Sequence, residues 1–318
     1  MLAAAVLWLC LTLFGAAVGI STTAPEQEAE SLTNSEAPRL EGYLYLDTEG
    51  RPLPFQTDEE IESFLTAAEI IDETQIPTGI TNPLKLTLKS DGIEAHAAFN
   101  HIDITRRDVT ERINGRSHFS FNWRDSYRYS IAAYRLDRLL GLYRVPLVVS
   151  RQIKTAQGAI SIWLEETVTE NQREREFKAD PPDLRRWNGQ RLLLQIFDDL
   201  VANRDSNFSN LLIDANWRLW FIDCTRCFGN TTVLYYPLAN IRQCERGMWE
   251  GLRNSSENEI REALTPYLSK AEMKALMGRR AKILRHFEKL IADQGEAAVL
   301  YDIEPPSETA PWAEAETP

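Results

Sequence analysis

The chain has 318 residues, of which 43% are hydrophobic and 26% are charged. This balance excludes a wholly disordered chain, and the length suits one large domain or two lobes that share a cleft. The net charge is −12 and basic residues form no patch, which excludes nucleic-acid binding.

The first twenty residues, MLAAAVLWLCLTLFGAAVGI, contain no charged side chain. Such a run is typical of a signal peptide, and the polar segment that follows it favours cleavage and export. Twenty apolar residues are also long enough to cross a bilayer, so residues 2–20 could instead remain as a membrane anchor. The sequence therefore predicts an exported protein that is periplasmic, secreted or held in a secretory-pathway lumen.

Two segments near the ends, residues 21–40 and 302–318, are rich in Pro, Ser, Thr, Ala and Glu. This composition predicts a disordered linker and a disordered acidic tail. Between them, strand patterns dominate residues 41–168 and helix patterns dominate residues 169–301. The predicted fold class is therefore α+β.

The first half alternates predicted strands with predicted helices. In chain order these are a helix over residues 58–72, a strand pair over 83–100, a helix within 126–146, and strands over 147–153 and 159–168. Apolar side chains at helical spacing indicate the helices, and a turn at residues 90–92 joins the first two strands. Gly141 suits the end of the second helix, and Pro146 prevents its continuation.

In the second half, a predicted helix over residues 187–203 leads into a polar loop. The apolar runs NLLID (210–214) and RLWFID (218–223) follow, separated by ANW, and predict a β-hairpin. Further along, Ser256 and Ser269 each precede a Glu by three residues, which is the spacing of a capping box. Two more helices are expected to begin there.

This hairpin would carry oxygen-bearing side chains to one end. Asn210 begins the first strand, Asp223 ends the second, and antiparallel pairing puts these positions side by side. Asp205 lies in the loop that leads into the hairpin. Carboxylate and amide oxygens are ligands that Mg²⁺ prefers, together with water and phosphate oxygens. Alternatively, Asp205 and Asn210 only build turns and Asp223 only ends a strand.

The stretch NRDSNFSNLLID…WRLWFID, residues 203–223, resembles the catalytic loop and metal-binding strand of the atypical kinases. These include the phosphatidylinositol 3- and 4-kinases and, more closely, the secretory-pathway kinases of the Golgi casein kinase type. Blocks from about Gly79 to Phe228 follow the order of that family. The resemblance implies a two-lobed protein kinase-like fold, with an N-lobe over residues 41–168 and a C-lobe over 169–301. It also implies phosphoryl transfer to a hydroxyl acceptor, dependent on ATP and on Mg²⁺ or Mn²⁺.

In that family one Asp orients the acceptor hydroxyl, and an Asn and a second Asp bind metal. Asp205, Asn210 and Asp223 match these positions. The lysine that holds the ATP phosphates is replaced by Asn100, and its glutamate partner on the adjacent helix is replaced by Ser130. The resemblance thus implies an altered phosphate pocket lined by Asn100 and Ser130. Two functions stay open: an active kinase, or a pseudokinase that binds a nucleotide or a partner.

Three further positions affect the predicted phosphate pocket. Lys85 and Lys89 lie on the strand before Asn100 and could replace the missing charge only by an unusual route. Ser206 stands where the family often has a basic residue, which removes another positive charge. The sequence does not indicate whether the acceptor is a protein, a sugar or a lipid.

Cys224 and Cys227 form a Cys-x-x-Cys motif directly after Asp223. Three interpretations are open: a redox-active pair, a zinc site that includes Cys244, or small side chains packed beneath the hairpin. A thioredoxin-type motif normally opens a helix in a small βαβ fold, and a zinc site needs further ligands. The sequence therefore favours the packing interpretation.

Overall fold

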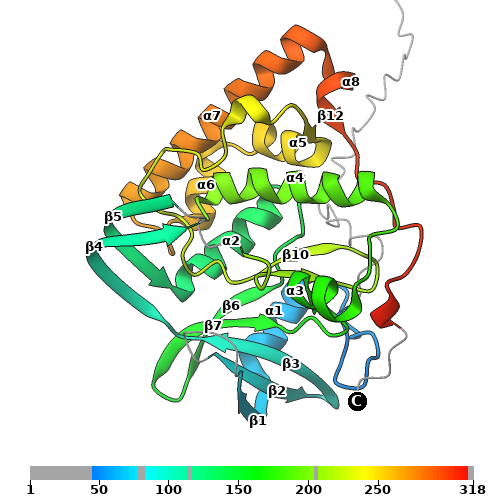
Figure 1. Cartoon of the computed structure of the whole chain (residues 1–318). Helices are drawn as coiled ribbons and strands as arrows, with labels where there is room; N and C mark the ends of the chain where they lie inside the picture. Colours follow the sequence, from blue (N-terminus) through cyan, green and yellow to red (C-terminus); the bar gives the residue numbers. More distant parts are fainter. Residues whose placement is uncertain (1–44, 77–82, 114–115, 204–206, 314–318) are drawn as a thin grey trace, which may run out of the picture. The chain divides into compact units, whose positions relative to one another are not determined.

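The computed structural model describes residues 45–76, 83–113, 116–203 and 207–313 (Figure 1). The predicted leader and linker, residues 1–40, lie outside these ranges. Within the ranges a sheet-rich region precedes a mainly helical one, which confirms the predicted α+β class. None of the helices described there is long and apolar enough to cross a membrane.

A five-stranded antiparallel sheet organises the first half, with the strand order β1-β2-β3-β7-β6. Its strands are β1 (Glu69–Gln75), β2 (Leu84–Ser90), β3 (Ile93–Asn100), β6 (Val148–Ile153) and β7 (Ala156–Ile162). The hairpins β2–β3 and β6–β7 are the two strand pairs predicted from sequence. Pairing of β3 with β7 joins the two hairpins into one sheet.

The two faces of β2 and β3 differ in character, because side chains alternate along a strand. One face is apolar and buried, and its residues are Leu86, Leu88, Ala95, Ala97 and Phe99. The opposite face, which we call the half-buried face, consists on these strands of Lys85, Thr87, His96, Ala98 and Asn100. On β7 the register adds Ser161, which lies opposite Ala98.

Helix α1 (Asp58–Ala67) is shorter than predicted, and the expectation of a helix as far as residue 72 is wrong. The backbone of Ala68 is extended, and the next residues form β1, where Ile70 pairs with Leu88. Pairing with β2 satisfies the backbone groups of this segment and outweighs its helical spacing of apolar residues. Helix α1 packs on β6 and β7, where Arg151 donates to the carbonyl oxygens of Leu65 and Ala68.

Between β3 and helix α2 (Tyr127–Leu139) the chain forms a two-stranded ribbon that was not predicted. Its strands are β4 (Asp103–Ile113) and β5 (Arg116–Ser126), and Figure 1 shows the ribbon on the left of the view. The predicted helix α2 is present and ends before Gly141, whose φ of 69° suits glycine. It contacts β6 and β7 and also α6 (Glu257–Leu264), so it links the two halves.

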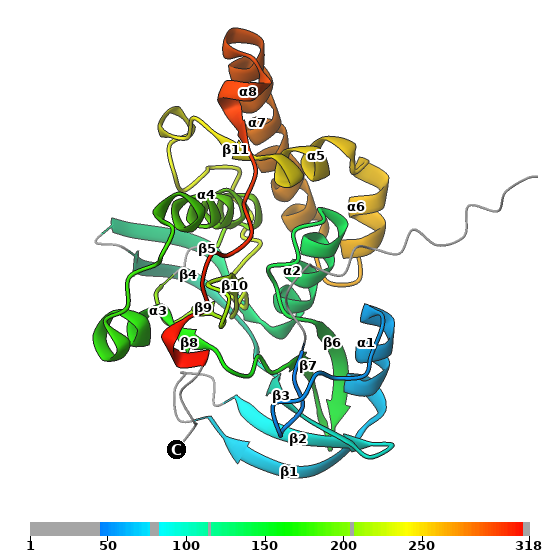
Figure 2. The same ribbon diagram turned by 90° about the vertical axis from the view of Figure 1, so that its right-hand side faces the viewer.

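The second half contains a small sheet and a group of helices. The sheet consists of β8 (Val168–Thr169), β9 (Leu211–Ile213) and β10 (Leu219–Phe221), and the predicted hairpin is β9–β10. The main helices are α4 (Leu184–Val201), α5 (Arg246–Asn254), α6 and α7 (Lys270–Gln294). Figures 1 and 2 both show the small sheet between these helices and the five-stranded sheet. The predicted capping boxes start α6 and α7.

The segment expected to be a disordered tail, residues 302–318, contains structured residues up to Ala313. The N–H of Ala310 donates to the carbonyl oxygen of Ala215 in the β9–β10 turn. Trp312 is buried, with its ring centroid 5.0 Å from that of Trp217. The composition of this segment, averaged over its length, is acidic and polar, so it does not reveal the few apolar residues, such as Trp312, that pack against the β9–β10 turn. This explains why the sequence predicted disorder for residues that the structure shows as ordered.

Candidate functional site

The β9–β10 hairpin brings Asn210 and Asp223 to one end. The ladder pairs Leu211 with Phe221, and the N–H of Ile222 then donates to the carbonyl oxygen of Asn210 at 3.2 Å. Asp223 is the next residue after this hydrogen bond. Two oxygen-bearing side chains that are thirteen positions apart in sequence therefore start from neighbouring points of the backbone.

The backbone of Asp223 leaves the strand in a left-handed conformation, with a φ of 58°. Aspartate tolerates this conformation better than most residues. The side chain is exposed, and its Oδ1 accepts a hydrogen bond from the hydroxyl of Thr225 at 3.1 Å. The turn thus presents an oriented carboxylate at the end of the hairpin.

The loop before β9 is shaped by Asn207. Its Oδ1 accepts from the N–H of Ser209 at 2.8 Å, and its carbonyl oxygen accepts from the N–H of Asn210 at 3.0 Å. This tight turn leads Asn210, which is half-buried, into the strand. Asp205, the predicted catalytic residue, lies outside the described residues.

The end of α4 is fixed by buried polar groups. Ala202 has a φ of 54° and ends the helix. The side-chain amide of Asn203 donates to Asp198 Oδ1 at 2.9 Å, and both residues are buried. The chain therefore leaves α4 in a defined direction toward the loop that precedes β9.

Asp199 ties the same helix to the segment that follows the Cys-x-x-Cys. Its Oδ1 accepts from the N–H groups of Tyr235 and Tyr236, at 2.5 and 3.1 Å. Burial raises the pKa of Asp199 to about 6, and its Oδ2 has no hydrogen-bond partner among the described groups. Arg279 of α7, also buried, donates to the carbonyl oxygens of Gly229 and Thr231 in that segment.

The residues predicted to line the phosphate pocket lie in β3 and α2. Asn100 ends β3, and its Oδ1 accepts from the N–H of Ile102 at 2.9 Å, so its side chain supports the turn into β4. Ser130 lies in the first turn of α2 and is half-buried. In the described part of the chain no hydrogen bond joins these two side chains, and neither supplies a charge.

Other polar groups occupy the half-buried face near the end of β7. The N–H of Trp163 donates to the carbonyl oxygen of His96 at 3.0 Å, and His96 Nδ1 lies 2.6 Å from Glu165 Oε1. The ammonium of Lys85 lies over the Trp163 ring, 4.6 Å from its centroid. No role was predicted for His96, Trp163 or Glu165. The alternation along residues 83–100 is the signal that places Lys85 and His96 on the same side as Asn100.

Cys224 and Cys227 are buried, and their Sγ atoms lie 2.7 Å apart. Burial raises the pKa of both thiols, which disfavours the reactive thiolate form. Within the described ranges no three His, Cys, Asp or Glu side chains cluster as metal ligands, so the zinc interpretation has no support there. The geometry favours packing beneath the hairpin over redox chemistry.

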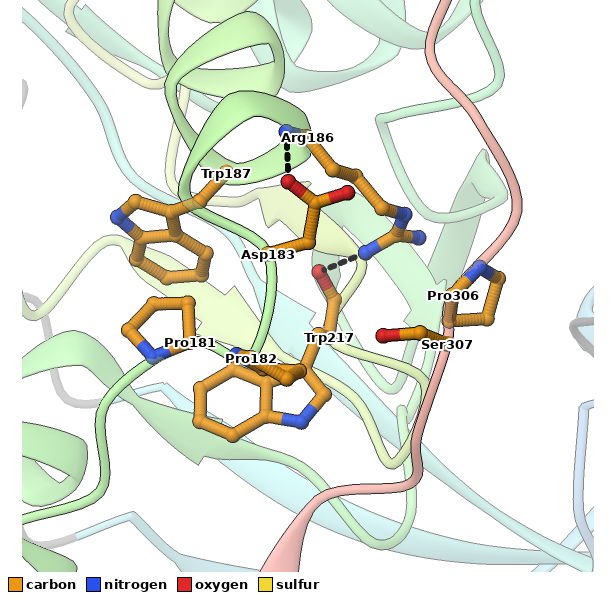
Figure 3. A pocket seen from close by; sticks show the side chains of 8 residues that line it. All are labelled: Pro181, Pro182, Asp183, Arg186, Trp187, Trp217, Pro306 and Ser307. Atoms are coloured by element: carbon orange, nitrogen blue, oxygen red, sulfur yellow. Dashed lines mark hydrogen bonds between the residues drawn. The ribbon is translucent and has the colours of Figure 1, made fainter.

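A small hollow lies near the start of α4, away from the residues predicted from sequence (Figure 3). Its lining residues are Pro181, Pro182, Asp183, Arg186, Trp187, Trp217, Pro306 and Ser307. Arg186 donates to the carbonyl oxygen of Trp217, and Asp183 caps the helix. These polar groups are engaged in holding α4 in place, so the hollow adds no chemistry to the site.

No protein-family model matches the sequence, and no curated protein matches it either. Solved structures do match the fold. Fam20 from hydra, determined with a sugar, has a TM-score of 0.57 and 19% identity, covering 78% of this chain and 94% of its own. The Golgi casein kinase has a TM-score of 0.53 and 17% identity, covering 78% of this chain and 80% of its own. Its Mn/ADP-bound form has the same TM-score and identity, with coverages of 77% and 79%.

The chain therefore has an atypical protein kinase-like fold, with a sheet-rich N-terminal region and a helical C-terminal region. Two particular proteins that share this fold are Fam20 and the Golgi casein kinase. The family resemblance inferred from residues 203–223 and the blocks before them is confirmed at the level of the fold.

Proposed function

We propose that the protein is a kinase that transfers a phosphoryl group from ATP to a hydroxyl acceptor, with Mg²⁺ or Mn²⁺ as the metal. The observation that carries this proposal is the meeting of Asn210 and Asp223 at one end of the β9–β10 hairpin in a kinase-like fold. The Golgi casein kinase with Mn and ADP bound gives further support for nucleotide and divalent metal.

In this proposal the Asp223 carboxylate and the Asn210 amide oxygen hold the metal ion. Their oxygen atoms are the donors that Mg²⁺ and Mn²⁺ take, and water and nucleotide phosphates would complete the coordination. When bound, the ion neutralises charge on the transferring phosphate. Thr225 steadies the Asp223 carboxylate by donating to its Oδ1. Asp205 would orient the acceptor hydroxyl, and Asn100 and Ser130 would line the phosphate pocket.

We also propose that the kinase lobes span residues 41–168 and 169–301 and that the protein is exported. The charge-free first twenty residues support export, and the similar fold of a kinase named for the Golgi is consistent with a secretory-pathway lumen. Residues 2–20 would either be removed as a signal peptide or anchor the protein to a membrane.

A second candidate function is that of a pseudokinase, which binds a nucleotide or a partner without turnover. The observation that favours it is that Asn100 and Ser130, which the proposal places in the phosphate pocket, carry no charge. Asn100 uses its side-chain oxygen to support the backbone at Ile102, and Ser130 cannot replace a glutamate. In this version Asn210 and Asp223 would still bind metal and nucleotide.

Calorimetric titration of the full chain with ATP, with and without Mg²⁺, tests the proposal. We expect Mg²⁺-dependent ATP binding by the wild type and loss of the Mg²⁺-dependent part in Asp223→Ala. Asp293→Ala is the matched control, because Asp293 is an exposed aspartate on α7. An Asp223→Ala protein that binds ATP and Mg²⁺ as well as the control does would refute the metal assignment.

Turnover separates the two candidate functions. ADP release is measured with Mg²⁺ or Mn²⁺ and with protein, sugar and lipid acceptors in turn. Acceptor-dependent ADP release that Asp223→Ala abolishes supports the kinase. ATP binding without ADP release for any of these acceptor classes supports the pseudokinase.

A further inference from the structure

The positive charge that the phosphate pocket lacks on β3 is present on the neighbouring strand. The register pairs Lys85 of β2 with Ala98 of β3, two residues before Asn100. Directly opposed residues of an antiparallel pair point to the same face, so Lys85 and Asn100 share the half-buried face. They are diagonal neighbours with backbones about 7–8 Å apart, a separation that long side chains bridge.

Lys85 is not neutralised by a carboxylate. It forms no ion pair with any residue in the described ranges, and its ammonium rests on the face of Trp163. Lys85, Ala98 and Ser161 lie opposite one another on β2, β3 and β7, and Trp163 follows β7. A cation that rests on an aromatic ring gains only modest stabilisation from the ring.

The neighbouring charged groups on this face are already paired. Lys89, an exposed residue farther along β2 on the same side as Lys85, lies 2.5 Å from Glu94. Glu165, which follows β7, is bonded to His96. Lys85 is therefore the cation of β2 that remains available to an anion in the cleft, and Glu165 does not compete for it.

We infer that Lys85 supplies to the phosphates of the bound nucleotide the positive charge that β3 lacks at Asn100. This inference rests on the proposed function, because it requires a nucleotide in the cleft. Without nucleotide the Trp163 ring holds the ammonium. With nucleotide, rotation of the long side chain brings the ammonium from the ring toward the phosphates near Asn100. Absence of a lysine on β3 then does not by itself make the protein a pseudokinase.

The test compares Lys85→Met with Lys89→Met in calorimetric titrations with ATP and with adenosine, both in Mg²⁺. A charge-assisted contact to phosphate is worth a factor on the order of 10–100 in affinity. We expect Lys85→Met to weaken ATP binding by about this factor and to leave adenosine binding unchanged. We expect Lys89→Met to bind both ligands as the wild type does. A purely structural role of Lys85 would weaken both ligands alike.

Two further variants make the test independent of folding defects. Lys85→Gln keeps a polar side chain on the half-buried face and should show the same selective loss of ATP affinity. The double variant Lys85→Met with Asn100→Lys returns the charge to β3 and should regain ATP affinity. Equal ATP affinities of the wild type, Lys85→Met and Lys85→Gln would overturn this inference alone. No ATP binding by the wild type would overturn the proposed function as well.

Discussion

Gly251 of α5 lies directly against the backbone of Leu140, the residue that caps the C-terminal end of α2. A methyl group added at Gly251 would lie 2.3 Å from the carbonyl oxygen of Leu140 and 2.9 Å from its Cα. These are backbone atoms, so they cannot rotate away as a side chain could. Close contact between α2 and α5 thus requires glycine at this position.

Gly251→Ala should destabilise the protein, because α5 must move away from α2 to accommodate the methyl group. Overpacking of this kind costs about 1–3 kcal/mol, and the higher helix propensity of alanine offsets about 1 kcal/mol of that. A net loss of up to about 2 kcal/mol in the free energy of unfolding is expected in urea titrations at pH 7.

Gly247→Ala is the matched control in the same helix. The atom nearest to its added methyl group is Glu245 Oε2 at 3.1 Å, a side-chain atom that accepts from the N–H of Met248 and caps α5. Because this atom is not backbone and lies farther away, a smaller loss of stability than that of Gly251→Ala is expected for this variant. Equal stabilities of the two variants would show that the contact between Gly251 and Leu140 does not limit the packing of α5.

Asp199 should make the stability of the protein depend on pH. Burial raises its pKa from 3.8 to about 6, so the folded state holds this proton more tightly than the unfolded state does. The stabilisation is complete below about pH 4 and is lost as the pH rises through about 6. Over this whole range the loss is on the order of 3 kcal/mol, since the pKa rises by about two units and one pKa unit corresponds to about 1.4 kcal/mol.

Asp199→Asn should remove this part of the pH dependence, because an amide does not titrate. Urea unfolding of the wild type and the variant at pH 4.5 and pH 7.5 measures the effect. The exposed Asp293→Asn variant should keep the wild-type slope. The prediction fails if wild type and Asp199→Asn lose the same stability between the two pH values.

The Cys-x-x-Cys should be unreactive in the folded protein. Cys224 and Cys227 are buried and their thiol pKa values are raised, so neither access nor ionisation favours alkylation. We expect native protein to resist iodoacetamide at pH 8 and denatured protein to be alkylated at both positions, as located by peptide mass spectrometry. Fast alkylation of either cysteine in native protein would revive the redox interpretation.

Local patterns were sufficient to predict much of the fold. The turn at residues 90–92 and the alternation around it define the β2–β3 hairpin, and the capping boxes at Ser256 and Ser269 define two helix starts. These signals lie within a few residues of the element that they specify. The first residues of β1, as far as residue 72, were mistaken for the end of a helix, and only the pairing with β2 reveals them as strand.

The candidate site divides in the same way, between contacts that nearby residues fix and contacts that depend on distant strands. Asn210 and Asp223 could be placed together from sequence, because a short hairpin fixes its own register. The contact of Lys85 with Trp163 could not, because it depends on the pairing of β3 with β7 across the inserted β4–β5 ribbon and α2. Nothing near Lys85 in the sequence indicates which aromatic ring it will meet.

Helix α2 is attached to the C-terminal half at both ends. Near its start, the N–H of Ser126 donates to the carbonyl oxygen of Thr225 at 2.8 Å, and the hydroxyl of Tyr129 donates to Glu272 of α7. At its end, Leu140 lies against Gly251. A helix held in this way cannot swing outward without breaking both attachments. In the proposed kinase, opening of the nucleotide site would therefore occur by bending of the β1–β2–β3 meander, and the stiffness of these three strands would set the rate at which a nucleotide enters and leaves.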